Sequence, residues 1–280
     1  MHGVAAVTPD DVWFVGQTWL VSDDAYVMHW DGTALQSGPV VNPGSYVALY
    51  AVAAVAANDV WAVGSTSSNG HDYFTLVEHW DGTHWSVVPT PGGAYDTLTG
   101  LAIVAPNDIW AVGWALFGAE ILHWNGSAWS ISPTGSVGNY AYFWGVSAIA
   151  TNDVWAFGAK SGIPLADHWT GTTWNIERTP KAGGSGNSLY AGFALASDDV
   201  WAVCQSLDSS WRTLAMHWDG ARWRTIKTPS PGSGEYLTNN LNGVWAAAAN
   251  DIWAVGVGQQ AMTLHFDGRR WREVANPGSQ

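Results

Sequence analysis

The sequence is poor in cysteine and in charged residues, and both scarcities exclude whole classes of protein. Cys204 is the one cysteine in 280 residues. An intrachain disulfide is therefore impossible, and the chain suits a reducing compartment or a secreted protein that needs no disulfide. Charged residues make up 12% of the chain, against 47% hydrophobic residues. This composition has too little charge for a disordered protein and enough apolar material for a large core.

Lysine and arginine are absent from residues 1–159, and the formal net charge of the chain is −13. Because nucleic-acid binding needs a basic face, we expect no nucleic-acid partner. No apolar run approaches the ~20 residues of a transmembrane helix, so we also expect no membrane insertion. The amino-terminal residues pass directly into a strand-like segment. We therefore expect no signal peptide, and we expect the chain to be part of a larger protein.

Tryptophan and glycine are abundant, at 21 and 32 residues, and much of the tryptophan belongs to six tandem repeats. In each repeat an Asp-(Val/Ile)-Trp motif is followed by a His-Trp pair (His-Phe in the last) and then by a turn of the type Asp-Gly, Asn-Gly or Thr-Gly. A further tryptophan closes five of the six repeats. The motif tryptophans recur every 45 to 52 residues, at Trp13, Trp61, Trp110, Trp155, Trp201 and Trp253.

Each repeat has the pattern of four short strands. In the second repeat these are a small, apolar segment at 50–55, an apolar segment at 59–64, a segment ending in His-Trp at 76–80, and a segment from 85 to 89. Four strands in a unit of this length are typical of a propeller blade. We predict an all-β fold, a six-bladed β-propeller of four-stranded antiparallel blades. It forms a single domain over 1–280, with blades at approximately 1–44, 45–92, 93–137, 138–183, 184–232 and 233–280.

The first, innermost strand of each blade is rich in alanine and glycine because little room exists near the axis. We expect every blade to contain its own four strands and the last blade to contact the first. The alternative is that the chain is a fragment of a larger ring.

The repeat "NDVWAVG…HWDGTHW" resembles the VWAVG-type propeller repeats of bacterial secreted and surface proteins. The resemblance covers the whole chain and implies the propeller fold and an extracellular or cell-surface location, but no particular activity. The repeat is more loosely similar to Asp-box and kelch blades. It departs from the Asp box because Asp81 to Trp85 is one residue too short, and it lacks the kelch double glycine. Sialidase chemistry therefore does not carry over.

Loop lengths distinguish the two ends of a blade. The step from the third-strand aromatic to the fourth-strand tryptophan is always five residues, whereas the segment from the motif tryptophan to the histidine varies from 12 to 18 residues. In an antiparallel meander the turns after strands one and three share one end. The loops after strands two and four share the other end. Variable loops on a rigid scaffold are where binding usually occurs, so we predict a binding face at the second end.

Aromatic residues outside the repeat pattern fall in or beside these variable loops. We predict a non-enzymatic module that binds a glycan or a protein there through aromatic contacts, without a cofactor or metal. The predicted ligand contacts are Trp19, Tyr95, Trp114, Tyr140, Trp144, Trp211, Arg212 and Tyr236. One alternative is that these aromatics only pack the loops, in a structural or protein-interaction propeller without a small ligand. Another is a carbohydrate-active enzyme that uses loop carboxylates, although no spacing in the sequence singles out a pair. The candidates are Asp23, Asp24, Asp72, Asp96, Glu120, Asp208 and Glu235.

The aspartate and histidine that recur in every repeat have a structural interpretation. A residue needed in every blade serves to build each blade, so we predict a buried histidine hydrogen-bonded to the aspartate before (Val/Ile)-Trp. A calcium site at Asp23 and Asp24, or at Asp72, lacks a full set of ligands at the required spacing.

Overall fold

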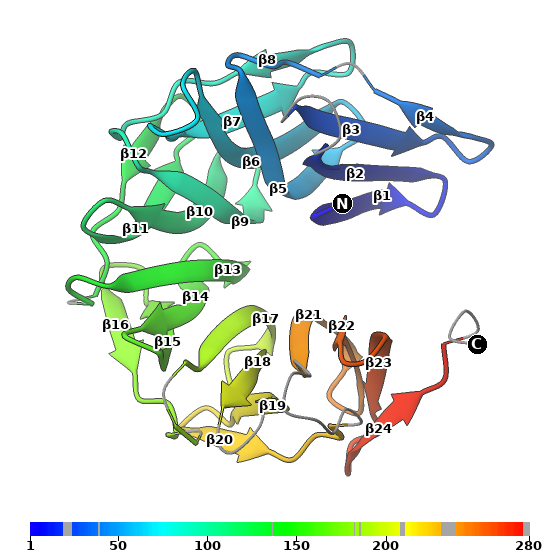
Figure 1. Cartoon of the computed structure of the whole chain (residues 1–280), viewed down its shortest axis with the longest axis vertical. Helices are drawn as coiled ribbons and strands as arrows, with labels where there is room; N and C mark the ends of the chain where they lie inside the picture. The colour runs from blue at the N-terminus through cyan, green and yellow to red at the C-terminus, as the bar shows by residue number, and fades with distance from the viewer. Residues whose placement is uncertain are drawn as a thin grey trace. The chain divides into compact units, whose positions relative to one another are not determined.

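A computed structural model describes residues 1–18, 24–38, 40–135, 137–181, 183–184, 186–207, 211–230 and 239–276. These residues form 24 strands in six sheets (Figure 1). Every sheet has four antiparallel strands that pair in sequence order, so each blade is built from its own four strands. The predicted fold class, a six-bladed β-propeller of four-stranded antiparallel blades, is confirmed.

The chain divides into two compact units, 1–133 and 134–280, of three blades each. The first unit contains blade 1, with β1 (Gly3–Thr8), β2 (Asp11–Gln17), β3 (Ala25–Trp30) and β4 (Leu35–Ser37). Its blade 2 contains β5 (Tyr46–Ala56), β6 (Asp59–Ser67), β7 (Phe74–Trp80) and β8 (Trp85–Val87). Its blade 3 contains β9 (Thr97–Ala105), β10 (Asp108–Ala115), β11 (Gly118–Trp124) and β12 (Trp129–Ile131).

The second unit repeats the same order. Blade 4 contains β13 (Ala141–Ala150), β14 (Asp153–Lys160), β15 (Ile163–Trp169) and β16 (Trp174–Glu177). Blade 5 contains β17 (Ser188–Ala196), β18 (Asp199–Leu207), β19 (Trp211–Trp218) and β20 (Trp223–Ile226). Blade 6 contains β21 (Asn240–Ala248), β22 (Asp251–Val257), β23 (Ala261–Phe266) and β24 (Trp271–Val274). The single domain and the contact between the last and first blades stay predictions.

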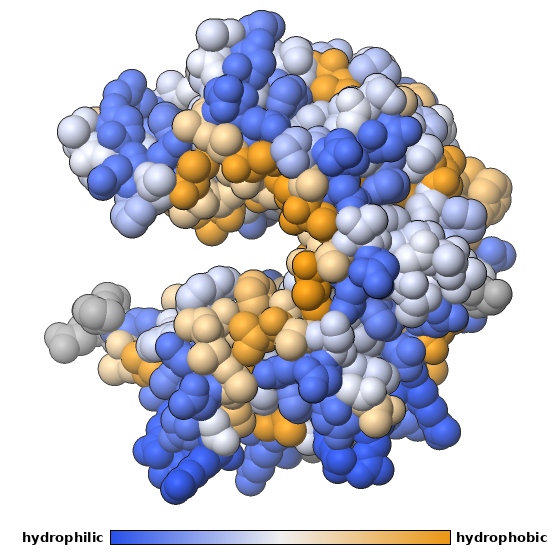
Figure 2. Space-filling view, turned by 180° about the vertical axis from the view of Figure 1, so that it is seen from behind, coloured by the Kyte–Doolittle hydropathy of each residue, from blue (hydrophilic) through white to orange (hydrophobic). Residues whose placement is uncertain are grey.

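Tryptophans fill the space between neighbouring blades within a unit. The Trp13 ring lies 5.3 Å from that of Trp80 and 5.5 Å from that of Trp85 in the next blade, and it packs in one buried cluster with Val15 and Leu49. Trp155 of blade 4 makes the same contacts with blade 5. Burying an aromatic ring removes a large apolar area from water, so these contacts account for the tryptophan content of the repeat. Within each unit, Figure 2 shows hydrophilic residues over the outer strands and apolar residues gathered nearer the first strands.

The aspartate before each (Val/Ile)-Trp holds two other side chains of the repeat. Its Oδ1 lies 2.7–2.9 Å from the histidine Nε2 of the third strand in all six blades. In blades 2 to 6 the same oxygen also accepts the indole N–H of the motif tryptophan, at 2.7–3.1 Å. The imidazole stacks on that indole with ring centroids 3.9–4.4 Å apart. We call this group the Asp–His–Trp cluster.

The cluster confirms the predicted pairing of histidine with aspartate and corrects the predicted burial. The six histidine side chains are 17–30% exposed rather than fully buried. The indole stacks on one face of each imidazole and covers the ring only in part.

Two carboxyl groups interrupt the apolar face of the third strand. Glu78 pairs with Ala62 across the ladder, and Asp167 pairs with Ala156. The other blades carry an apolar residue at this register position: Met28, Leu122, Met216 and Leu264. Because Ala62 packs in the same cluster as Trp13, the Glu78 side chain lies between blades 1 and 2. Neither of its oxygens has a partner among the described residues, and burial raises its pKa to about 8.

The Asp–His–Trp cluster predicts a stability difference between two histidines of the first unit. His123→Ala should lower the free energy of unfolding by about 1–3 kcal/mol, because it leaves the buried Asp108 without its imidazole partner. His84→Ala is the control: the His84 side chain is 68% exposed, and its contacts with Asp81 and Thr83 lie within its own turn. Its effect should stay within about 0.5 kcal/mol. Equal losses in denaturant unfolding of the two variants would contradict this role of the cluster.

The buried Glu78 predicts a pH dependence of stability. Its folded-state pKa of about 8 lies above the ordinary value of 4.5, so between these pH values the folded state holds a proton that the unfolded state releases. Its contribution to the free energy of unfolding therefore falls as pH rises from about 5 to 8, by roughly 1.4 kcal/mol per unit of pKa difference.

Denaturant unfolding at a series of pH values checks this expectation. Glu78→Gln should flatten the dependence, because it removes the titrating group. Glu273→Gln, at an exposed position of β24, should leave the dependence as in the parent protein. If Glu78→Gln retains the full slope, Glu78 does not titrate as proposed.

Candidate functional site

The turns after strands one and three, which we call the constant turns, pack on each other in every blade. Their residues are therefore restricted by this packing. The glycine of the turn between strands three and four has a φ of 82–94° in every blade. A Cβ on that glycine would lie 2.7–2.8 Å from the Cβ of the residue in the neighbouring constant turn. Both conditions favour glycine, so the Asp-Gly and Asn-Gly turns are structural.

The first strands of blades 2, 4 and 5 carry a β-bulge that presents an aromatic side chain. In blade 2, Leu49 pairs with Gly64 and Ala51 with Val63, which leaves Tyr50 as the extra residue. Trp144 and Tyr190 hold the same place in blades 4 and 5. A bulge re-aims the side chain that it inserts. Next to the bulge of blade 2, a Cβ on Gly64 would lie 1.8 Å from the carbonyl oxygen of Ala48, so the motif needs a glycine there.

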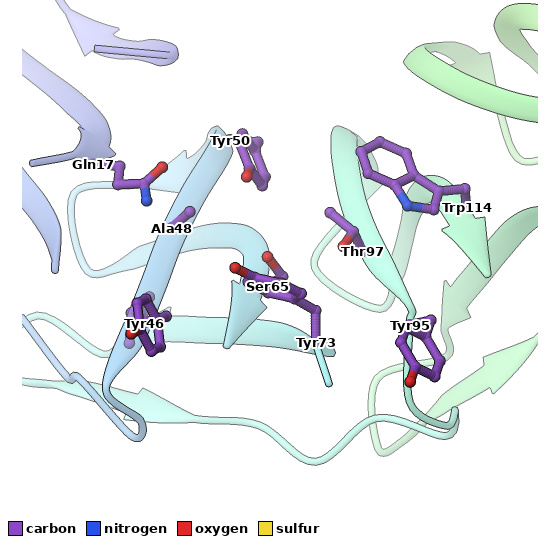
Figure 3. Close-up of a pocket in the computed structure, with 10 residues that line it drawn as sticks. Gln17, Tyr46, Ala48, Tyr50, Ser65, Tyr73, Tyr95, Thr97 and Trp114 are labelled. Carbon is purple, nitrogen blue, oxygen red and sulfur yellow. The ribbon is translucent and has the colours of Figure 1, made fainter. Parts of the chain in front are cut away.

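An open pocket of about 290 Å³ lies at the variable-loop end of the first unit. Figure 3 shows two tyrosines of β5 on one side and Trp114, Thr97 and Tyr95 on the other, with Ser65 and Tyr73 between them. We call it the tyrosine cleft. Its lining comes from all three blades of the unit: Gln17, Tyr46, Val47, Ala48, Tyr50, Ser65, Tyr73, Tyr95, Thr97 and Trp114.

Hydrogen bonds hold the aromatic rings of the cleft in place. Tyr50 is half-buried and hydrogen-bonded to Ser65, and burial is the main cause that raises its pKa. The backbone N–H groups of Tyr95 and Asp96 both donate to the Tyr73 carbonyl, at 2.6 and 3.1 Å, and so join the two variable loops. Tyr95 has a φ of 72°, which is unfavourable for a side chain of its size, and these bonds maintain it.

A carboxylate stands at the edge of the cleft. Asp72 accepts hydrogen bonds from Asn69 Nδ2, at 2.8 Å, and from the Tyr95 hydroxyl. These bonds lower the pKa of Asp72, and they raise that of Tyr95, which is 47% exposed. Asp72 is therefore ionised at neutral pH and sits next to one of the cleft's aromatic rings.

Two further carboxyl groups, those of Asp96 and Glu120, lie behind the loop that follows blade 2. Asp96 accepts the backbone N–H groups of Gly93, at 2.6 Å, and of Leu116, at 3.4 Å. Glu120 pairs with Gly113, a register position that holds leucine in blades 2, 4 and 5. Burial, and secondly the charge of Asp96, raise the pKa of Glu120 to about 8. Both side chains are more than nine-tenths buried, and neither lines the cleft.

Of the predicted contacts, Tyr95 and Trp114 line the same cleft. The other predicted contacts that lie within the described residues belong to the second unit. Tyr140 is 81% exposed, with a φ of 60°, in the turn before β13. Trp144 is half-buried; its Nε1 donates to Ser188 Oγ at 2.9 Å, and its ring lies 6.1 Å from that of Tyr190. Trp211 and Arg212 begin β19, half-buried and exposed respectively. Trp19 and Tyr236 lie outside the described residues.

Two features of the cleft were beyond the sequence prediction of contacts. The predicted contacts do not include Tyr46 or Tyr73, and Tyr50 opens the segment 50–55 that the sequence predicts as a small, apolar strand. The signal for Tyr50 is the bulge, which repeats at Trp144 and Tyr190. A large aromatic in the middle of an alanine-rich inner strand marks it in the sequence.

The described residues contain no group of three or more His, Cys, Asp or Glu side chains placed to hold a metal ion. None of these described residues belongs to a helix long and apolar enough to cross a membrane. A second pocket, also of about 290 Å³, lies in the second unit around Ser161, Ile163 and Lys181 and has no aromatic in its lining.

Comparisons with known proteins give matches among solved structures. No family model and no curated protein matches the sequence. YCF48 bound to a D1 peptide matches with a TM-score of 0.63 and 14% identity, over 96% of this chain and 79% of that one. A six-bladed fungal lectin with a fucose recognition mode, from Aleuria aurantia, matches with a TM-score of 0.58 and 14% identity, over 99% and 97%.

SapL1 lectin in complex with α-methyl fucoside matches with a TM-score of 0.59 and 9% identity, over 99% of this chain and 96% of that one. At such identities the likeness concerns the fold. The chain is thus similar in fold to one protein described with a bound peptide and to another described in complex with a fucoside.

Proposed function

We propose that this chain is a non-enzymatic binding module that takes a glycan or a protein segment in the tyrosine cleft. The observation that carries the proposal is the lining itself. Four tyrosines and one tryptophan, all outside the repeat motif, line one open pocket at the end of the blades where loop lengths vary. Structural requirements of the blade do not explain their convergence, whereas aromatic rings with polar edges are common in binding sites.

The fold neighbours support binding as the type of function. YCF48 is described with a D1 peptide, and the lectins with fucose or fucosides. These are the two ligand classes that the loop aromatics indicate. Trp19, Tyr140, Trp144, Trp211, Arg212 and Tyr236 remain proposed contacts, in addition to Tyr95 and Trp114 of the cleft.

An enzyme that uses loop carboxylates is the less favoured function. Asp96 and Glu120 are the closest approach to a carboxyl pair in this region, and Glu120 has the raised pKa of a general acid. However, a glycosidase needs both groups at the bond that is cleaved. Both side chains are buried behind the loop and do not line the pocket.

A structural propeller without a small ligand is the second alternative. In that case the cleft aromatics only pack the loops, and truncating one lowers the melting temperature without any loss of binding. The two functions therefore make opposite predictions for a single variant.

The test compares Trp114→Ala with Trp245→Ala, which removes an exposed tryptophan of β21 in the second unit. Glycan and peptide arrays on the parent protein first identify a ligand. Trp114→Ala should then raise its dissociation constant about 30-fold, because truncating an aromatic anchor costs ~2 kcal/mol, with little change in melting temperature. Trp245→Ala should leave binding unchanged. The proposal fails if the arrays identify no ligand, or if Trp114→Ala lowers only the melting temperature.

A further inference from the structure

Charge is divided unequally between the two units. The first unit, residues 1–133, contains twelve Asp and Glu residues and no Lys or Arg. The second unit, residues 134–280, contains eleven Asp and Glu residues and all ten Lys and Arg residues. The tyrosine cleft belongs entirely to the first unit. A ligand that reaches the cleft therefore meets a negative field, which attracts cations and repels anions.

The lining of the cleft is suited to a cation at short range. Tyrosine and tryptophan ring faces attract an ammonium or guanidinium group that lies within about 6 Å of the ring centroid. Rings approach the cleft from two sides, Tyr46 and Tyr50 from β5 and Trp114 from β10 (Figure 3). The lining contains no positively charged side chain that would compete for these faces.

Asp72 supplies the counter-charge at the edge of the cleft. Its carboxylate is held by the Asn69 amide and the Tyr95 hydroxyl, so its position relative to the Tyr95 ring is defined. A cation that stacks on Tyr95 lies within reach of this carboxylate. An ion pair in addition to the ring contacts makes the site prefer a cation, whereas stacking of a neutral sugar requires no charged group.

We infer that the tyrosine cleft binds the lysine or arginine side chains of a basic peptide segment. This inference rests on the proposed binding function and specifies its ligand. A pocket of about 290 Å³ is at the small end of ligand sites and accommodates one or two side chains. The long apolar stems of lysine and arginine pack along aromatic surface while the charged head reaches a carboxylate, here that of Asp72.

The test uses a lysine-rich octapeptide with blocked ends, the same peptide with every lysine acetylated, and a glutamate version. Isothermal titration at low salt should give binding of the lysine peptide, at least about tenfold weaker binding of the acetylated peptide, and no binding of the glutamate peptide. Raising the salt concentration should weaken binding of the lysine peptide.

Two charge-matched variants separate the cleft from the general field of the unit. Asp72→Asn should weaken binding of the lysine peptide about tenfold. Asp81→Asn removes the same charge from the same unit, but in a constant turn where blade 3 naturally has Asn125, and should change binding less than about twofold. Equal effects of the two variants, or equal binding of the lysine and acetylated peptides, would overturn the inference.

Failure of this inference is distinguishable from failure of the proposed function. If a neutral glycan binds and Trp114→Ala abolishes that binding, while the lysine peptide does not bind, the cleft is a binding site but not for cations. If Trp114→Ala alters the binding of neither the glycan nor the peptide, the binding function of the cleft is wrong as well.

Discussion

One carboxylate oxygen per blade organises the repeat. The Oδ1 atom of the aspartate at the start of the second strand accepts a hydrogen bond from the third-strand histidine, and in five blades also from the motif tryptophan. The imidazole stacks on the indole, and the outer face of the indole packs against aromatics of the next blade within the unit. The contacts of this one oxygen thus fix the position of the indole ring that fills the space between neighbouring blades. This is the reason why Asp, His and Trp recur together at fixed register.

Three blades depart from this repeat by carrying a buried carboxyl in the third strand, and one of the three, Asp167 of blade 4, lies in the second unit. Glu78 and Glu120 replace apolar residues of the third strand in two consecutive blades of the first unit, and each bears a pKa raised by burial. The bulge of β5 turns Tyr50 toward a pocket that two other blades also line. Buried carboxyls cost stability. The bulge itself recurs in blades 2 to 6 and belongs to the repeat, so what varies is the residue that it carries, an aromatic in blades 2, 4 and 5.

The cleft combines features that occur separately in other sites. Aromatic faces alone suit a sugar or a peptide, and an acidic surface alone is often only a solvated one. Here the rings, the anchored carboxylate of Asp72 and the absence of lysine and arginine from residues 1–133 coincide. The propellers of similar fold are described with different ligands, a peptide in one case and fucosides in others. The fold therefore carries the loops, and the loop side chains decide the ligand.

The sequence by itself determined the architecture, because the blade is a local unit. Its four strands lie within one repeat, residues 46 to 87 in blade 2, and the aspartate and histidine of its Asp–His–Trp cluster are 14 to 20 residues apart. Six copies repeat the same pattern. The sequence also predicted that binding occurs at the end of the blades that carries the variable loops, and it predicted two residues of the cleft as contacts, Tyr95 and Trp114. Only the tertiary structure decided which aromatics converge, because Tyr46, Tyr73 and Trp114 come from elements that are tens of residues apart. The bulge that turns Tyr50 depends on backbone pairing between neighbouring strands, and residue types alone do not specify that register.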